Sequence, residues 1–333
     1  RCLDGEGRVA GVRIHGFCRT PRRVNTPHLL SSLSRSQLQD RLRGDGLDLL
    51  LPPLAVRAPS RIDVVAEGLG CLYADYQLTP SRDTGFSDFH LSLMPHRSWF
   101  RPLCSFQLDG VQPFTPLALG EAFALFEWGL NWCVTSHCHQ WVTLHAAVLE
   151  RGGRAVILPA PPGSGKSTLC AALMFHGWRL LSDELTLIEP ESGLVMPSPR
   201  PVSLKNASID VIRERVPDCT IGPVAYDTQK GTVAHLKVSQ ESLLRAGERA
   251  LPAWVVFPKY ERGAPLDVRA RTKSAALVDL ASNSFNQHVH GRVGFQSLVR
   301  LVDGCDSFDL RYSQLDQALA WFDALEPPVV GIP

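Results

Sequence analysis

Residues 158–168 read LPAPPGSGKST, a run of small residues that ends in Gly-Lys-Ser directly after an apolar segment. In this pattern the backbone N–H groups of the loop wrap a triphosphate, the lysine adds a positive charge, and the serine hydroxyl can hold Mg²⁺. The pattern therefore predicts a nucleotide-binding phosphate loop. Its residues are Gly163, Ser164, Gly165, Lys166, Ser167 and Thr168.

The segment before the loop predicts a hairpin. Residues 143–150 (TLHAAVLE) and 155–158 (AVIL) are strand-like, and the RGGR between them is a tight-turn signal. A turn this short joins antiparallel strands, because a parallel pair needs a long crossover. Pairing the strands about Gly152-Gly153 places His145 opposite Ala160, at the start of the phosphate loop. We therefore expect an imidazole beside the nucleotide, or a core histidine with satisfied hydrogen bonds.

The segment after the loop predicts an acidic group near the γ-phosphate. A helix is expected over residues 166–176 and a strand over 178–182, and Asp183 and Glu184 follow that strand directly. In a strand–loop–helix–strand unit the end of the second strand lies near the phosphate loop. Two chemistries fit: Asp183 can hold Mg²⁺ while Glu184 orients an attacking water, as in an ATPase, or Asp183 can accept the proton of an acceptor hydroxyl, as in a kinase.

These pieces together resemble a known family. LHAAV with His145, the glycine-containing turn, GSGKS and GWRLLSDE are similar, in order and separation, to the C-terminal kinase domain of HPr kinase/phosphorylase. The resemblance covers residues 144 to about 322, and the HPr-kinase-related kinase A group looks most similar. It implies an α/β fold with an HPr-kinase/PEP-carboxykinase-like P-loop core, here preceded by a smaller N-terminal α+β module.

The resemblance also implies roles for individual residues. Asp183 corresponds to the general base, His145 to its partner, Lys166 to the phosphate-binding lysine, and Ser167 with Glu184 to the metal ligands. The implied cofactors are ATP and Mg²⁺, and the implied acceptor is a serine or threonine hydroxyl on a small protein or peptide. Further candidate contacts to substrate or phosphate are Lys205, Lys230, Lys273, Asn283 and Asn286.

Two departures from the family pattern shape the expected reaction. Ala160 stands where the phosphate loop has its first glycine, and the segment RPVSLKNASIDVI has Lys205-Asn206 where the bifunctional enzyme has an acid followed by Arg-Gly. The kinase reaction is therefore expected without the reverse phosphorylase activity. The sequence leaves two alternatives open: a small-molecule kinase, including an enzyme related to phosphoenolpyruvate carboxykinases, and a non-catalytic nucleotide-binding sensor or scaffold.

Hydrophobic patterns and turn-forming residues divide the chain into four parts. Residues 1–33 are expected to be a poorly ordered basic tail, 34–115 a small α+β module with a helix over 34–43, 116–140 a connecting helix, and 141–326 the kinase domain. Residues 226–235 (YDTQKGTVAH) suggest either a mobile loop over the acceptor, with Lys230 as a phosphate contact, or an exposed turn.

Composition limits the partners and the compartment. The formal charge is +1 over 333 residues, so the body of the chain shows no basic patch for nucleic acid. The most apolar stretch, 122–134, contains Glu127 and Asn131, which argues against a membrane span. Nine scattered cysteines favour reduced thiols and a cytoplasmic protein, and the family resemblance implies a homo-oligomer.

One cysteine-histidine cluster has the residue types of a metal site. Cys133, His137, Cys138 and His139 lie within seven residues. Zinc normally needs a second ligand pair at matching spacing, which the sequence does not offer. The end of an amphipathic helix is the favoured interpretation.

Overall fold

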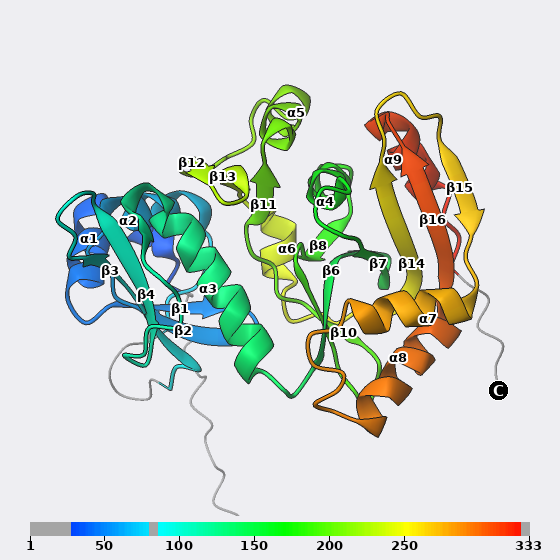
Figure 1. Ribbon diagram of the computed structural model, residues 1–333, viewed down its shortest axis with the longest axis horizontal. Coiled ribbons are helices and arrows are strands. Elements are labelled where there is room, and N and C mark those ends of the chain that lie inside the picture. Colours follow the sequence, from blue (N-terminus) through cyan, green and yellow to red (C-terminus); the bar gives the residue numbers. More distant parts are fainter. Residues whose placement is uncertain (1–27, 80–85, 328–333) are drawn as a thin grey trace, which may run out of the picture.

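The computed structural model describes residues 28–79 and 86–327, and it shows a mixed α/β protein in two halves that lie side by side (Figure 1). An N-terminal module forms one half. The larger half carries residues 158–168, the predicted phosphate loop, and is called the P-loop half after that prediction. Within the described residues, no helix has both the length and the apolar character to cross a membrane.

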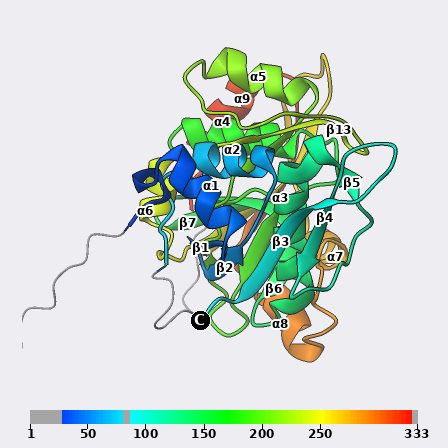
Figure 2. The same cartoon turned by 90° about the vertical axis from the view of Figure 1, so that its left-hand side faces the viewer.

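The N-terminal module is a five-stranded sheet covered by helices. Its strand order is β1-β2-β3-β4-β5, with only the β2–β3 pair parallel. Figure 2 views the molecule from the side of this module. Its elements are η1 (Leu30–Ser32), α1 (Arg35–Arg43), β1 (Leu47–Leu51), β2 (Leu54–Ala58), α2 (Asp63–Leu72), β3 (Phe89–His96), β4 (Leu103–Leu108), β5 (Leu117–Ala118), η2 (Leu119–Glu121) and α3 (Ala122–His137).

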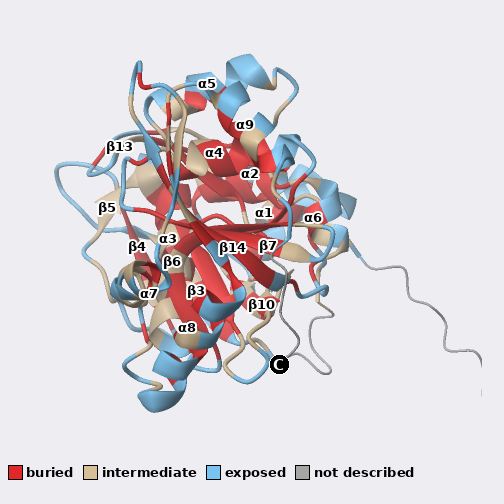
Figure 3. Cartoon of the chain, turned by 90° about the vertical axis from the view of Figure 1, so that its right-hand side faces the viewer, coloured by how far each residue is buried: buried red, intermediate tan, exposed pale blue. Residues whose placement is uncertain are grey.

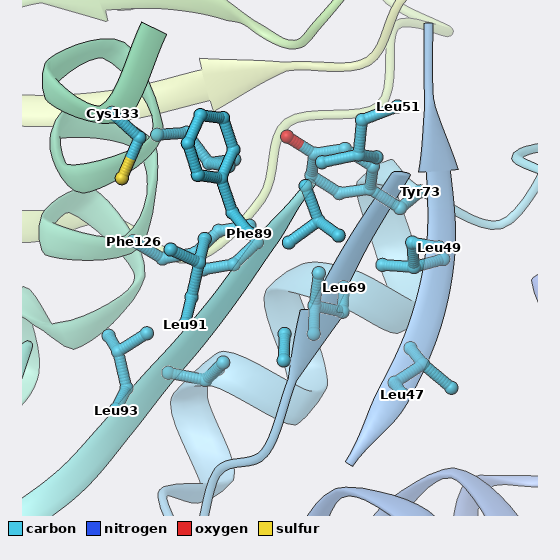
Figure 4. Packing of buried hydrophobic residues seen from close by; sticks show 14 of the residues in the cluster. Leu47, Leu49, Leu51, Leu69, Tyr73, Phe89, Leu91, Leu93, Phe126 and Cys133 are labelled. Atoms are coloured by element: carbon cyan, nitrogen blue, oxygen red, sulfur yellow. The ribbon is translucent and has the colours of Figure 1, made fainter. Parts of the chain in front are cut away.

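The core of the module lies between its sheet and α2 and α3. Phe126 and Cys133 of α3 face Phe89 and Leu91 of β3, with Tyr73 beside them (Figure 4). Each of these side chains is at most 6% exposed. The expected helix over residues 34–43 is present as α1, and its Ser34–Gln37 capping box explains why it begins there.

Three boundaries differ from the sequence interpretation. Leu30 is buried and donates its N–H to Tyr76 O at 2.9 Å, so the module begins before residue 34. The expected tail otherwise lies outside the described residues. The connecting helix expected over 116–140 begins at Ala122, because Leu117-Ala118 pair with β4, and it ends at His137. This helix packs into the module's core.

The P-loop half is built on an eight-stranded mixed sheet. Strand order is β10-β9-β6-β7-β14-β16-β15, and β8 also pairs with β6. A separate three-stranded sheet has the order β11-β13-β12. The strands are β6 (Val142–Arg151), β7 (Arg154–Pro159), β8 (Arg179–Ser182), β9 (Leu185–Ile188), β10 (Val195–Met196), β11 (Val202–Lys205), β12 (Ala225–Thr228), β13 (Gly231–Leu236), β14 (Leu251–Tyr260), β15 (Asp267–Ala270) and β16 (Asp306–Tyr312).

The predicted hairpin is confirmed with its register. Strands β6 and β7 pair antiparallel with Arg151 opposite Arg154 and Ala146 opposite Pro159. Both turn glycines, Gly152 and Gly153, have positive φ, which glycine adopts without strain. The next pair outward on this register is His145 and Ala160, as the sequence predicts.

Helices cover both faces of the central sheet. Alternate residues of β6 point to opposite faces: Ala147 and Leu149 pack toward α4 and α9, whereas Ala146 and Val148 pack toward α7 and α8. Figure 3 shows β7, β14 and α4 as mostly buried. The helices of this half are α4 (Lys166–Phe175), α5 (Ala207–Arg215), α6 (Gln240–Leu244), α7 (Lys273–Ser282), α8 (Arg292–Gly304) and α9 (Leu315–Asp323).

Candidate functional site

The phosphate loop lies between β7 and α4 and is fixed by its neighbours. Gly163 and Gly165 have φ of 85° and 84°, so both adopt the left-handed conformation. Tyr260 N donates to Ser164 O at 2.8 Å. A Cβ at Gly165 would lie 2.8 Å from Tyr260 Cβ and 3.0 Å from the Tyr312 hydroxyl. The residue types of the loop are therefore set by backbone conformation and by close packing.

A cavity of about 560 Å³ opens over this loop. His145, Glu184, Ser203 and Lys205 line one part of its wall, together with all six predicted loop residues. Another part of the wall comes from α5 and from residues 313–316 before and within α9. A volume of this size is in the range that binds small ligands and cofactors.

Asp183 lies directly behind the loop serine. Its Oδ2 accepts hydrogen bonds from Ser167 Oγ and from Ser203 N, both at 3.1 Å. The side chain is 4% exposed, and burial raises the pKa of Asp183, although the Lys166 ammonium opposes this. The predicted proximity of Asp183 to the phosphate loop is thus confirmed, but Asp183 does not contribute to the wall of the large cavity.

Glu184 contributes the carboxylate that does face the large cavity. Asn131 of α3 donates its side-chain N–H to Glu184 Oε2, and Lys205 Nζ lies 3.8 Å from Oε1. Burial alone would raise the pKa of Glu184, but Lys205 and Lys166 outweigh burial and lower it. Glu184 is therefore ionised at neutral pH.

His145 reaches the same cavity from β6. Its backbone N donates to Asn283 O at 2.7 Å, and its ring packs against Phe285 with 5.8 Å between centroids. Burial, assisted by Lys166, lowers the pKa of His145 to about 4, so the ring is uncharged at neutral pH. Among the described residues, no hydrogen bond joins His145 to Asp183.

Lys230 lies at the tip of a hairpin near the other polar residues. The stretch 226–235, interpreted as a loop or turn, forms strands β12 and β13. Lys230 Nζ lies 4.8 Å from the centroid of the Trp128 ring, a cation–π contact. Burial lowers the pKa of Lys230, while Glu184 raises it. Lys230 thus lies close enough to Glu184 for an electrostatic interaction, although it does not line the large cavity.

Three other candidates lie outside the cavity wall and stabilise the fold. Lys273 Nζ donates to Val302 O at 3.1 Å and to Asp303 O, near the end of α8. Asn283 caps α7 through Asp279 O. Asn286 is 1% exposed and joins β6 to this region, because its amide pairs with Thr143 N and Trp141 O.

The sequence interpretation missed several polar residues next to Asp183 and Glu184. Arg200 lies 3.5 Å from Glu127, which also accepts a 2.5 Å hydrogen bond from Tyr73, and Arg200 donates to Asn131 as well. Trp128, Ser203 and His235 lie around them. One signal was present in the sequence: Glu127 and Asn131 are polar residues inside an otherwise apolar helix.

The residue types at the site fit the expected Mg²⁺ ion only if other ligands complete its coordination. In the described parts of the chain, no three Asp, Glu, His or Cys side chains gather in a way that would hold a metal by themselves. Magnesium commonly uses one or two protein ligands, with water and phosphate supplying the rest. The hydroxyl of Ser167 and the ionised carboxylate of Glu184 are the two protein ligands that the site could supply.

The cysteine-histidine cluster packs into the N-terminal module. Cys133 and Cys138 are at most 4% exposed, and burial raises the pKa of their thiols to about 12 and about 11. The His137 ring packs on Trp132 and Phe89, with centroid separations of 5.3 and 6.2 Å. The two cysteines therefore pack in the core of the module, whereas the side chains of His137 and His139 are exposed.

No known protein-family model matches the chain, and no curated protein matches it significantly. The function proposed below therefore rests on the residues of the site and on their geometry.

Proposed function

We propose that the protein is an ATP- and Mg²⁺-dependent kinase with an HPr-kinase-like P-loop core. It transfers the γ-phosphate to a serine or threonine hydroxyl of a small protein or peptide. The observation that carries this proposal is the hydrogen bond between Ser167 of the phosphate loop and Asp183. It links a triphosphate-binding loop to a carboxylate that retains a second oxygen for a proton.

In this proposal each residue has one task. Lys166 and the loop N–H groups hold the phosphates, and bound Mg²⁺ neutralises phosphate charge, with Ser167 and Glu184 as its candidate ligands. Asp183 Oδ1 accepts the proton of the acceptor hydroxyl, while that oxygen bonds to the γ-phosphorus and the bond to ADP breaks. His145, being uncharged, orients groups in the cavity without repelling Lys166.

The residues around Lys205 favour the forward reaction. The family resemblance expects an acid where Lys205 stands, and here Lys205 pairs with Glu184 instead. A cation in place of a metal ligand supports kinase activity without the reverse phosphorylase reaction. A small-molecule acceptor is the second candidate, because the 560 Å³ cavity can enclose a small ligand as well as phosphates.

The test is intact-mass spectrometry of peptides and small proteins from the source cell after incubation with ATP and Mg²⁺. We expect one phosphate to be gained with the wild type and transfer to fall at least about 100-fold with Asp183→Asn, since general bases contribute that much or more. Asp210→Asn, an exposed acid on α5, is the matched control.

The outcomes separate the candidate functions. ATP binding by calorimetry without a mass gain on any polypeptide would contradict the protein-kinase proposal and favour a metabolite acceptor or a sensor. Transfer that survives Asp183→Asn would remove Asp183 as the base.

A further inference from the structure

A second, smaller cavity lies at the seam between the two halves. Its walls come from α3 of the N-terminal module and from β11, β13 and the end of β8 in the P-loop half. Its volume is about 20 Å³, enough for one or two small polar groups. Glu184 and Ser203 line both this cavity and the large one, so the two are adjacent.

The small cavity is surrounded by buried polar atoms without partners. Four of them have no hydrogen-bond partner among the described residues: Trp128 Nε1, Asp183 Oδ1, Ser203 Oγ and His235 Nε2. A fifth, Arg200 Nη1, makes no hydrogen bond there and has only its ion pair with Glu127 at 3.5 Å. The side chains of Asp183, Ser203 and His235 are at most 5% exposed. Buried polar atoms are rarely left unpaired, so this concentration around one cavity indicates a polar occupant.

The chemistry of these atoms restricts the occupant. Trp128 Nε1 and Arg200 Nη1 can only donate, so an ammonium group, which cannot accept, is disfavoured. Asp183 and Glu184, which also line the cavity, disfavour a carboxylate or phosphate. A neutral hydroxyl can donate to Asp183 Oδ1 and accept from Trp128 or Arg200 at the same time. The volume admits a hydroxymethyl group.

We propose that this cavity is the acceptor subsite and that it takes the hydroxymethyl group of a serine-type acceptor. The inference rests on the proposed kinase function and adds where the acceptor binds. Asp183 lines the small cavity and is tied to the phosphate loop: its Oδ2 accepts a hydrogen bond from Ser167, which lines the large cavity, and its Oδ1 receives the hydroxyl proton. Helix α3 therefore makes the N-terminal module part of acceptor recognition.

The test uses the full chain with ¹⁵N-labelled tryptophan, in which the indole N–H of Trp128 reports on the cavity. Spectra are recorded with Mg²⁺ and a non-hydrolysable ATP analogue, and then with N-acetylserinamide or N-acetylalaninamide, which lacks only the hydroxyl. Trp128→Phe and Trp132→Phe assign the two indole signals of α3. We expect the Trp128 signal to shift with the serine probe only, while Trp132, outside the cavity, stays unchanged.

A kinetic measurement accompanies the spectra. With N-acetylserinamide as acceptor, Trp128→Phe keeps the ring but removes the donor, and its KM is expected to rise about tenfold, the value of one hydrogen bond. Trp132→Phe is expected to match the wild type.

Each outcome has a distinct meaning. Equal shifts with both probes, or none with either while the ATP analogue binds, would overturn the subsite: the cavity would hold ordered water only, and the kinase proposal would stand. Failure of the ATP analogue to bind would overturn the proposed function itself. A shift specific to the serine probe in that case would still support a hydroxyl site.

Discussion

Asp183 uses its two carboxylate oxygens differently. Oδ2 is held by Ser167 and by the backbone of Ser203, which fixes the side chain, whereas Oδ1 accepts no hydrogen bond from an N–H or O–H group of the described residues. A fixed carboxylate with one open oxygen suits the proposed proton transfer, because no further conformational entropy is lost in orienting it.

The phosphate loop gives the first prediction at the residue scale. Gly163→Ala and Gly165→Ala both place a side chain at a φ near +85°, which costs about 1–2 kcal/mol. Only at Gly165 would the new Cβ also meet Tyr260 and Tyr312, whereas nothing lies within 4 Å at Gly163. Overpacking adds about 1–3 kcal/mol, so Gly165→Ala should be the less stable variant and should bind ATP more weakly.

Urea unfolding and calorimetric titration with ATP measure the two effects. Equal losses of unfolding free energy for the two variants would show that packing against Tyr260 does not constrain the loop.

Sequence reasoning located the residues of the site that belong to one continuous stretch. The hairpin register placed His145, and the strand–loop–helix–strand order placed Asp183, because both depend on local pairing. Trp128, Arg200 and His235 could not be placed in this way, since they come from three distant segments that only tertiary packing brings together. Lys273 was assigned to phosphate by resemblance, but it contacts the end of α8.

At the scale of elements, close packing of α3 determines the shape of the N-terminal module. Gly129 of α3 lies against Phe106 of β4, and a Cβ there would be 2.2 Å from the ring. Gly68 of α2 meets Phe123 of α3 in the same way, at 2.1 Å. These glycines let α3 approach both the sheet and α2 at a distance that no larger residue permits.

The second prediction compares two helical glycines. Alanine favours a helix over glycine by about 1 kcal/mol, and Gly304 in α8 has open space around its Cβ position, so Gly304→Ala should be neutral or stabilising. At Gly129 the ring of Phe106 must move, and overpacking costs about 1–3 kcal/mol. Gly129→Ala should therefore lower the unfolding free energy despite its better propensity.

Chemical denaturation of both variants at one pH provides the measurement. A Gly129→Ala protein as stable as Gly304→Ala would mean that α3 can shift without cost.

Element prediction succeeded where periodicity and local signals agreed. The helical spacing of residues 34–43 and the turn glycines at 152–153 predicted α1 and the β6–β7 hairpin correctly. Leu117-Ala118 continue the apolar pattern of α3, and only their pairing with β4 excludes them from the helix.

At the scale of the whole molecule, the two halves are joined by buried polar groups as well as by apolar contacts. Tyr73 and Glu127 of the module meet Arg200 of the P-loop half, and Asn131 reaches Glu184. Leu185 and Leu187 of β9 belong to the same apolar cluster as the module's core. Stability and site chemistry therefore depend on the same seam.

The third prediction concerns the pH dependence of stability. Burial lowers the pKa of His235 to about 4, well below the value near 6.5 expected when the chain is unfolded. Between these values the unfolded state binds a proton that the folded state does not, so this contribution is complete above pH 6.5 and is lost as the pH falls toward 4. His145 acts in the same direction.

Glu127 acts in the opposite direction. Burial raises its pKa to about 7, so its folded form holds a proton that the unfolded form releases, and its contribution is lost as the pH rises from 4.5 toward 7. The two histidines together contribute more to the free energy of unfolding than the one glutamate. The stability of the wild type should therefore fall as the pH is lowered.

The test compares urea unfolding at pH 7 and pH 4.5. His235→Gln, which cannot titrate, should lose about 2–3 kcal/mol less than the wild type over this range, while the exposed His139→Gln should follow the wild type. Parallel pH dependence for wild type and His235→Gln would show that His235 is not held uncharged by burial.

The polar groups between the two halves also matter while the chain is still being synthesised. Domains generally fold as units during synthesis, N-terminal first, so α3 leaves the ribosome before β8, β11 and β13 exist to cover it. Glu127 and Asn131 then lie on an open helix surface where water can hydrate them. The polar groups that later surround Asp183 thus reduce the apolar surface that the nascent module exposes while the second half is still being made.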